Sequence, residues 1–182
     1  VGFQLSVVRF ELPIAEARVP KGGDVTTEVR PVVSIVVTVF NEEENVPLLA
    51  EEIRRALDPQ GIPYEVVAVD DGSTDGTWER LETVRAQDPR WVLVGLRRNF
   101  GQTAAMSAGF DHARGEVIVT LDEDLQNDPA DIPRLLEVAK DHDVVSGWRK
   151  NRQDPFLSRR LPSMLANWLI SRVTGIRLHD YG

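Results

Sequence analysis

Four largely apolar, β-branched runs constrain the fold of this chain more than any other feature of its sequence. They are VVSIVVTVF at residues 32–40, YEVVAV at 64–69, WVLVGL at 91–96 and VIVTL at 117–121. Runs without regular alternation of polar and apolar residues are typical of strands buried on both faces, as in parallel sheets. They predict the buried strands of an α/β domain.

Helical patterns separate these runs. After the first run, Val46, Leu49, Ile53 and Leu57 recur at helical spacing, and Gly61 breaks the pattern. Further helices are expected at about 75–87, 101–113 and 129–140, with a short fifth strand at 143–146. Alternating strands and helices indicate βαβ units, and therefore a mostly parallel sheet flanked by helices in a single domain.

The chain of 182 residues suits one domain with a substantial core, which we expect at residues 31–150. Residues 1–30 are expected to be an N-terminal extension, with an edge strand at 7–12 and a linker at 20–27 (PKGGDVTT). Residues 151–182 are expected to form a basic amphipathic segment that ends before a membrane part outside this chain.

Composition argues against several classes of function. A formal net charge of −8 disfavours a general nucleic-acid binder, which needs a basic footprint, so no nucleic-acid partner is expected. A cysteine count of 0 excludes disulfides, thiolate metal sites and a cysteine nucleophile, and it fits a reducing compartment. No apolar stretch reaches the roughly 20 residues that a membrane span needs.

Polar residues follow each apolar run directly. They are Asn41 and Glu42, Asp70 and Asp71, Arg98 and Asn99, and the acidic triplet 122–124. Right-handed crossovers bring the carboxyl ends of parallel strands to one edge of the sheet, so these residues should line one crevice. Acidic groups after the first two strands could accept hydrogen bonds from a base and a ribose. Asp71, Asp75 and Asn99 are also open to interpretation as turn or helix-cap residues.

Asp122 and Asp124 are predicted to bind a divalent cation. Side chains alternate along extended backbone, so both carboxylates can point to one side while Glu123 points elsewhere. Mg²⁺ and Mn²⁺ take oxygen ligands, often one or two carboxylates. The loop after the first run, VFNEEEN, is not a G-x-G-x-x-G motif, and no P-loop is present, so a cation is the expected holder of a diphosphate. A solvated acidic turn is the alternative interpretation.

The segment from residue 147 to residue 177 is strongly basic. It has one acid, Asp154, against the basic residues Arg149, Lys150, Arg152, Arg159, Arg160, Arg172 and Arg177. Arginine forks match phosphate oxygens bidentately, although a solvated basic face is an alternative. An apolar stripe at helical spacing overlaps the segment, at Leu161, Met164, Leu165, Trp168, Leu169 and Val173. This stripe predicts either a core-facing helix or a helix on an anionic membrane surface.

Several motifs, in order and spacing, resemble the family 2 glycosyltransferases, which have a GT-A fold. They are TVFNEEENV, VVAVDDGSTDGT, RNFGQTAAMSAGF and LDEDLQNDP. The later motifs GWRKNRQDPFLSRRLPS and LHDYG resemble the polyprenyl-phosphate branch of that family, which includes dolichyl-phosphate mannose synthase and bacterial undecaprenyl-phosphate glycosyltransferases. The resemblance covers residues 31–182.

The resemblance implies roles for the donor-side residues. Phe40, Asn41 and Glu42 would line the nucleoside, and Asp70 or Asp71 would bind the base. Arg98 and Asn99 would belong to the same donor site. The metal and the donor diphosphate would be held by Asp122, Asp124 and Gln126, of which Asp124 is the principal metal ligand. Asp122 would reach either the metal or the sugar and ribose, and Gln126 could instead be a turn residue.

The resemblance also implies an acceptor site and a reaction. The acceptor phosphate would be bound by Arg149, Arg152, Arg160 and Ser163, and the catalytic set would be Asp122, Asp124, Arg149 and Arg152. Asp180 would shape the acceptor pocket rather than act as an obligatory base. The implied reaction is inverting, Mg²⁺- or Mn²⁺-dependent transfer of a sugar from a UDP- or GDP-sugar to an undecaprenyl or dolichyl phosphate.

Two alternative functions follow from the same motifs. One is a family 2 transferase acting on a hydroxyl acceptor, and the other is a nucleotide-sugar-binding domain without turnover. The main hypothesis places the protein at the cytoplasmic face of a membrane, in cell-envelope glycan synthesis, and it also allows a homo-oligomer.

Overall fold

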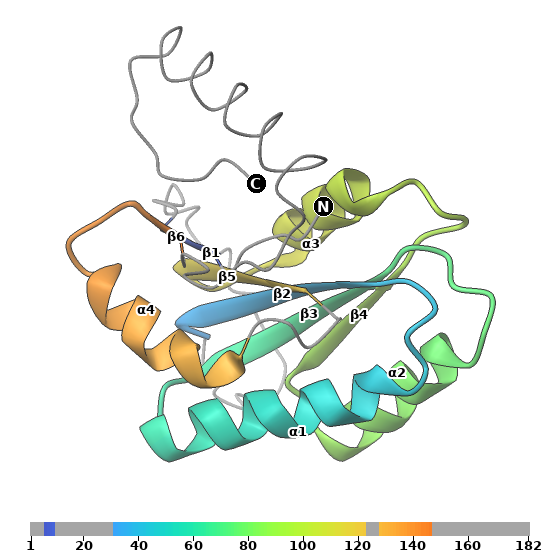
Figure 1. Ribbon diagram of the computed structural model, residues 1–182, viewed down its shortest axis with the longest axis horizontal. Coiled ribbons are helices and arrows are strands. Elements are labelled where there is room, and N and C mark those ends of the chain that lie inside the picture. Colours follow the sequence, from blue (N-terminus) through green and yellow to red (C-terminus); the bar gives the residue numbers. More distant parts are fainter. Residues whose placement is uncertain (1–5, 10–30, 123–127, 147–182) are drawn as a thin grey trace, which may run out of the picture. The chain divides into compact units, whose positions relative to one another are not determined.

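The computed structural model describes residues 6–9, 31–122 and 128–146 (Figure 1). Within these residues the chain forms a six-stranded sheet in the order β4-β3-β2-β5-β1-β6. The strands are β1 (Ser6–Arg9), β2 (Val33–Val39), β3 (Tyr64–Asp70), β4 (Trp91–Gly95), β5 (Val117–Asp122) and β6 (Val144–Ser146). Strands β4, β3, β2 and β5 are parallel, as predicted, whereas β1 runs antiparallel to both β5 and β6.

Helices cover both faces of the sheet (Figure 1). The α-helices are α1 (Asn45–Leu57), α2 (Thr77–Gln87), α3 (Gln102–His112) and α4 (Ile132–Val138), and the 3-10 turns are η1 (Asp58–Gln60) and η2 (Pro129–Asp131). Helix α3 lies on one face, and α1, α2 and α4 lie on the other. The predicted α/β fold, with a mostly parallel sheet flanked by helices, is therefore confirmed.

The core consists of two apolar layers separated by the sheet. Ile35 and Val37 of β2 pack with Leu49 and Ile53 of α1 on one face. On the other face, Val36 and Val67 pack with Ala105 of α3, and partly buried apolar residues of β4 join them. Strands β2 and β3 are buried along their whole length. This agrees with their largely apolar sequences, which are typical of central strands covered on both faces.

An ion pair between buried Glu65 and partly exposed Arg114 stabilises the edge of the sheet where β2, β3 and β5 begin. Glu65 is 2% exposed. Its Oε1 atom accepts hydrogen bonds from Ser34 Oγ at 2.6 Å and from the Arg114 backbone N–H at 2.7 Å. Its Oε2 atom accepts one from Arg114 Nε at 2.9 Å. The Ser34 hydroxyl oxygen also accepts from the Gly115 N–H at 2.8 Å. One carboxylate thus joins two strands to the turn before β5.

The N-terminal strand differs from the prediction. A strand was expected at the sheet edge over residues 7–12, but β1 lies between β5 and β6 and is an internal strand. Val7 is 0% exposed and pairs with Val119 on one side and Val145 on the other. Local sequence pattern does not distinguish an edge strand from an internal one, because the partners are far along the chain. The predicted linker at 20–27 lies outside the described residues.

Within the described part of the chain, none of the helices has both the length and the apolar character that a membrane crossing requires.

Candidate functional site

The carboxyl ends of β2, β3, β4 and β5 meet at one edge of the sheet, which we call the carboxyl edge. The end of β3 is its centre. The Asp71 N–H donates to the Val39 carbonyl at 2.9 Å, and the Leu96 N–H donates to the Asp70 carbonyl at 2.9 Å. Residues following β3 and β4 are therefore tied to neighbouring strand ends. In β5, Asp122 pairs with Thr38 of β2, so the acidic triplet begins at the same edge.

The loop after β2 is held in place by the loop after β3. The Asn41 backbone N–H donates to Ser73 Oγ at 2.9 Å, and Asn41 Oδ1 accepts from the Thr74 N–H at 2.9 Å. The Glu42 N–H donates to Thr77 Oγ1 at 2.8 Å. Asn41 has φ 57, a left-handed conformation that asparagine tolerates better than most residues. The side-chain oxygen of Asn41 thus shapes the loop.

Two other residues of the loop after β2 face different surroundings. Phe40 is 38% exposed and offers an apolar surface at the carboxyl edge. Glu42 is half-buried, and its Oε2 atom accepts a hydrogen bond from Asn45 Nδ2 at 2.5 Å. Phe40 is therefore the side chain of this loop that is open for stacking with a flat ring.

The adjacent aspartates at the end of β3 have different partners, although both are buried. Asp70 Oδ1 accepts from the Ser73 N–H at 3.0 Å and from Ser73 Oγ at 2.5 Å, and no described donor reaches its Oδ2. Asp71 uses both oxygens: Oδ1 accepts from the Phe100 N–H at 2.8 Å and Oδ2 from the Gly101 N–H at 2.9 Å. The sequence alone did not show that these two carboxylates have different hydrogen-bond partners.

The loop after β4 is exposed at the carboxyl edge but anchored through its backbone. The Arg98 guanidinium carbon lies 4.8 Å from the centroid of the Phe100 ring, and Asn99 is exposed. Helix α3 has Gly101, not Asn99, at its N-cap, so the interpretation of Asn99 as a helix cap is wrong. Arg98 forms no ion pair with any acidic side chain in the described ranges.

Gly72 is required where the loops after β3 and β4 touch. It has φ +74, and an added Cβ would lie 2.4 Å from the Arg98 carbonyl carbon. We expect Gly72→Ala to lower the free energy of unfolding by about 1 kcal/mol more than Gly61→Ala does. Gly61 is the matched control, because it has φ +64 but nothing within 4 Å. Equal losses in urea unfolding would show that the two loops do not press on each other.

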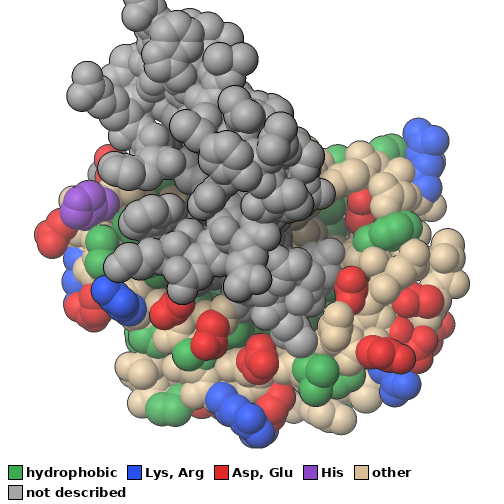
Figure 2. Space-filling view, viewed as in Figure 1, with side chains coloured by type: hydrophobic (Ala, Val, Ile, Leu, Met, Phe, Trp, Pro, Cys, Tyr) green, Lys and Arg blue, Asp and Glu red, His purple; other side chains and the backbone are tan. Residues whose placement is uncertain are grey.

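Carboxylates already occupy the N-termini of two helices at the carboxyl edge, α2 and α3. Asp71 accepts from the two N–H groups before α3, and Asp75 Oδ1 accepts from the Thr77 N–H at 3.0 Å at the start of α2. The hydrogen bond from the Thr77 hydroxyl is the main cause of the lowered pKa of Asp75, which agrees with its interpretation as a turn residue. Acidic side chains gather at this end of the molecule (Figure 2). A helix N-terminus occupied by a carboxylate is a poor phosphate site, so a diphosphate bound here would need a cation.

Several predicted site residues lie outside the described residues. They are Asp124, Gln126, Arg149, Arg152, Arg160 and Ser163. Asp122 is described only as the last residue of β5. In the described ranges, no group of three or more acidic, His or Cys side chains could hold a metal ion. The metal and acceptor assignments therefore stay predictions.

The residues that sequence reasoning did not assign are Ser73, Thr74 and Thr77, which hold the loop after β2. The signal was present in the motif DDGSTDGT, whose hydroxyl groups can bond to nearby backbone.

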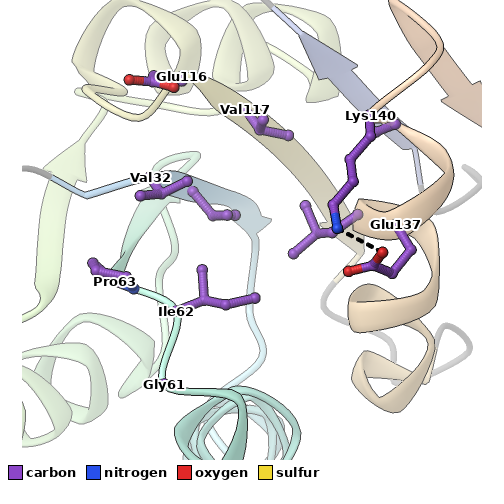
Figure 3. A pocket seen from close by; sticks show the side chains of 11 residues that line it. Val32, Gly61, Ile62, Pro63, Glu116, Val117, Glu137 and Lys140 are labelled. Carbon is purple, nitrogen blue, oxygen red and sulfur yellow. Dashed lines mark hydrogen bonds and ion pairs between the residues drawn. The ribbon is translucent and has the colours of Figure 1, made fainter.

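A separate apolar cavity of about 580 Å³ lies at the opposite edge of the sheet. Its walls include Val32, Ile62 and Val117, near the starts of β2, β3 and β5 (Figure 3). At one side, Lys140 Nζ points toward Glu137 and lies 2.6 Å from its Oε2 atom. The cavity is remote from the polar strand ends and is not part of the candidate site.

The architecture is that of a glycosyltransferase domain. The structure is similar to the mannosyltransferase PcManGT from Pyrobaculum calidifontis in complex with GDP-Man and Mn²⁺, with a TM-score of 0.56 and 27% identity, over 63% of this chain and 34% of that chain. It also resembles S. aureus TarS 1–349 in complex with UDP-GlcNAc, with a TM-score of 0.50 and 23% identity, over 60% of this chain and 31% of that one, a likeness of fold alone.

Sequence comparison gives the family. Residues 34–181 match the model of glycosyl transferase family 2, and the chain belongs to this family. It is 47% identical over 152 residues to dodecaprenyl-phosphate galacturonate synthase of Rhizobium johnstonii, covering 82% of this chain and 45% of that protein. It is also 47% identical, over 82% of this chain and 44% of the relative, to undecaprenyl-phosphate 4-deoxy-4-formamido-L-arabinose transferase of Pseudomonas fluorescens. The chain thus spans less than half the length of these relatives.

Proposed function

We propose that this chain forms the donor-binding part of an enzyme that transfers a sugar from a UDP- or GDP-sugar to a polyprenyl phosphate, with inversion. The observation that supports donor binding is the combination of side chains at the carboxyl edge. Asp70, buried at the end of β3, has a carboxylate oxygen without a described donor, and exposed Phe40 directly follows Val39, the residue of β2 that pairs with Asp70. Such a pair suits a nucleoside, whose base has hydrogen-bond donors and a flat apolar face. The names of the relatives support the class of acceptor.

The proposed donor site combines described and undescribed residues. Phe40, Glu42 and Asp70 would contact the nucleoside, and Arg98 and Asn99 would extend the site toward the rest of the donor. Mg²⁺ or Mn²⁺ would be held by Asp122, Asp124 and Gln126, an oxygen donor set that suits hard cations. When bound, the cation would neutralise the charge of the departing nucleoside diphosphate. The presence of Mn²⁺ with PcManGT supports a divalent cation.

The proposed acceptor site lies in the basic segment. Arg149, Arg152, Arg160 and Ser163 would bind the lipid phosphate. A phosphate monoester has a second pKa of roughly 6, so its oxygen is already ionised at neutral pH and needs orientation rather than a base. This oxygen would attack the anomeric carbon as the bond from that carbon to the diphosphate oxygen breaks. The nucleoside diphosphate leaves from the opposite face, which inverts the configuration.

A lipid acceptor would put the reaction at a membrane surface, and we propose the cytoplasmic face, as the resemblance to the polyprenyl-phosphate branch implies.

A thermal-shift screen tests the donor side. UDP, GDP and their sugars are added with and without Mn²⁺, and a ligand at 100 times its Kd should stabilise the fold by about 2.7 kcal/mol. We expect stabilisation with one of the two bases, dependent on Mn²⁺ and reduced in Asp70→Asn. Asp111→Asn is the control, because Asp111 is exposed near the end of α3. Absence of any nucleotide effect on the wild-type chain would contradict the proposal.

A further inference from the structure

We propose that Asp71 is a positioning residue of the donor site, which holds the loop after β4 in place without touching the nucleotide. The inference rests on the proposed function, because the loop that Asp71 holds carries Arg98 and Asn99. It separates the roles of two adjacent aspartates that the motif alone leaves equivalent.

The hydrogen bonds of Asp71 connect two strand ends with the start of a helix. Its carboxylate accepts from the Phe100 and Gly101 N–H groups at 2.8 Å and 2.9 Å, and its own N–H donates to the Val39 carbonyl at 2.9 Å. The residue is 4% exposed. Asp71 therefore ties the end of β2, the end of β3 and the start of α3 to one another.

The neighbouring contacts restrict the same loop from both sides. Gly72 leaves no room for a Cβ against the Arg98 backbone, at 2.4 Å, and the Asn99 nitrogen lies 2.7 Å from the same Cβ position. The Leu96 N–H donates to the Asp70 carbonyl at 2.9 Å, which fixes the loop where it leaves β4. A carboxylate at the N-terminus of α3 is also favoured by the helix dipole. The loop is consequently held to the end of β3 both where it leaves β4 and where it enters α3.

Asp70 provides the contrast. Its Oδ1 atom bonds within its own turn, to Ser73, and its Oδ2 atom has no donor among the described residues. Both Asp71 oxygens, in comparison, receive backbone N–H groups from a loop 29 and 30 residues further along the chain. Asp70 has an acceptor to offer to a ligand, and the Asp71 carboxylate is already used by the protein.

A double-mutant cycle tests this role. Dissociation constants for UDP and GDP with Mn²⁺ are measured by calorimetry for Asp71→Asn, Arg98→Ala and the double variant. Asn keeps one acceptor oxygen but loses a charge-assisted hydrogen bond, so we expect about tenfold weaker binding. If Asp71 acts through the loop, the double variant should bind about as weakly as the weaker single variant. Asp111→Asn, which removes the same charge from an exposed site, should leave binding unchanged.

Two results would overturn the proposal. One is multiplication of the two losses to about a hundredfold in the double variant, which would indicate that Asp71 contacts the nucleotide independently. The other is unchanged amide hydrogen exchange at Phe100 and Gly101 in Asp71→Asn, which we expect to become faster. If the Asp71→Asn variant does not fold, amide hydrogen exchange is measured on the wild-type chain instead. Fast exchange at Phe100 and Gly101 there would also overturn the proposal, because it would show that Asp71 does not protect these two amides. A wild-type chain that binds neither nucleotide would contradict the proposed function, and the exchange data would still decide whether Asp71 holds the loop.

Discussion

Replacing Asp124 with asparagine is expected to slow release of nucleoside diphosphate from the sugar donor by about a thousandfold. At the carboxyl edge, carboxylates already occupy the starts of two helices, with Asp71 at α3 and Asp75 at α2. The acids at this end would instead repel a diphosphate. A cation must then offset the charge, and Asp124 is its principal proposed ligand.

Asp128→Asn is the matched control for this variant. It removes one carboxylate four residues further on, where Asp128 Oδ1 accepts from the Ala130 N–H at 2.9 Å, a bond that an asparagine oxygen can keep. We expect near-normal turnover for Asp128→Asn at saturating Mn²⁺. Normal turnover of Asp124→Asn, or an equal loss in both variants, would remove the acidic triplet from the mechanism.

Replacing Arg114 with alanine is expected to lower the free energy of unfolding by about 2 kcal/mol. In the structure, Arg114 Nη2 lies 2.8 Å from Oε2 of Glu65, a residue that is 2% exposed. The substitution removes this ion-pair partner and leaves the buried carboxylate charge of Glu65 without it. Removal of one partner from a fully buried pair costs roughly 3 to 5 kcal/mol. The value here is smaller because the Arg114 side chain is 56% exposed and Glu65 keeps its bonds to Ser34 and the Arg114 backbone.

Urea unfolding at pH 7 measures this loss, with Arg85→Ala as the control. Arg85 is exposed on α2 and forms no ion pair with an acid in the described ranges, so its removal should change stability by less than about 0.5 kcal/mol. Equal effects of the two substitutions would show that Glu65 does not depend on Arg114.

The order and type of the main elements could be predicted from the sequence because they are locally encoded. The run at 64–69, for example, becomes β3, which is buried along its whole length, and Gly61 ends the preceding helical pattern with φ 64. The position of β1 could not be predicted, because its partners β5 and β6 lie more than a hundred residues further along the chain. Strand pairing at such separation leaves no local signal.

The candidate site shows the same division. That the residues following β2, β3 and β4 meet could be predicted from the parallel topology. Which of the two aspartates, Asp70 or Asp71, keeps a carboxylate oxygen without a described donor could not be predicted. The partners of Asp71 are backbone N–H groups of Phe100 and Gly101, which leave no signal in the sequence near Asp71. Asn41 was assigned to the nucleoside by resemblance, whereas its side-chain oxygen in the structure receives the Thr74 N–H. Whether it also contacts a nucleotide stays a prediction.

Paramagnetic broadening by Mn²⁺ tests the central claim most directly, namely that a cation and a nucleoside diphosphate bind together at the carboxyl edge. Strand β3 has 7 residues, so the two edges of the sheet are about 20 Å apart at about 3.3 Å per residue. With Mn²⁺ and UDP or GDP added together, the amide signals of Gly72 and Phe100 should broaden strongly, while those of Gly61 and Gly115 at the opposite edge should change little. Broadening centred on Gly61 and Gly115, or none that depends on the nucleotide, would contradict the account.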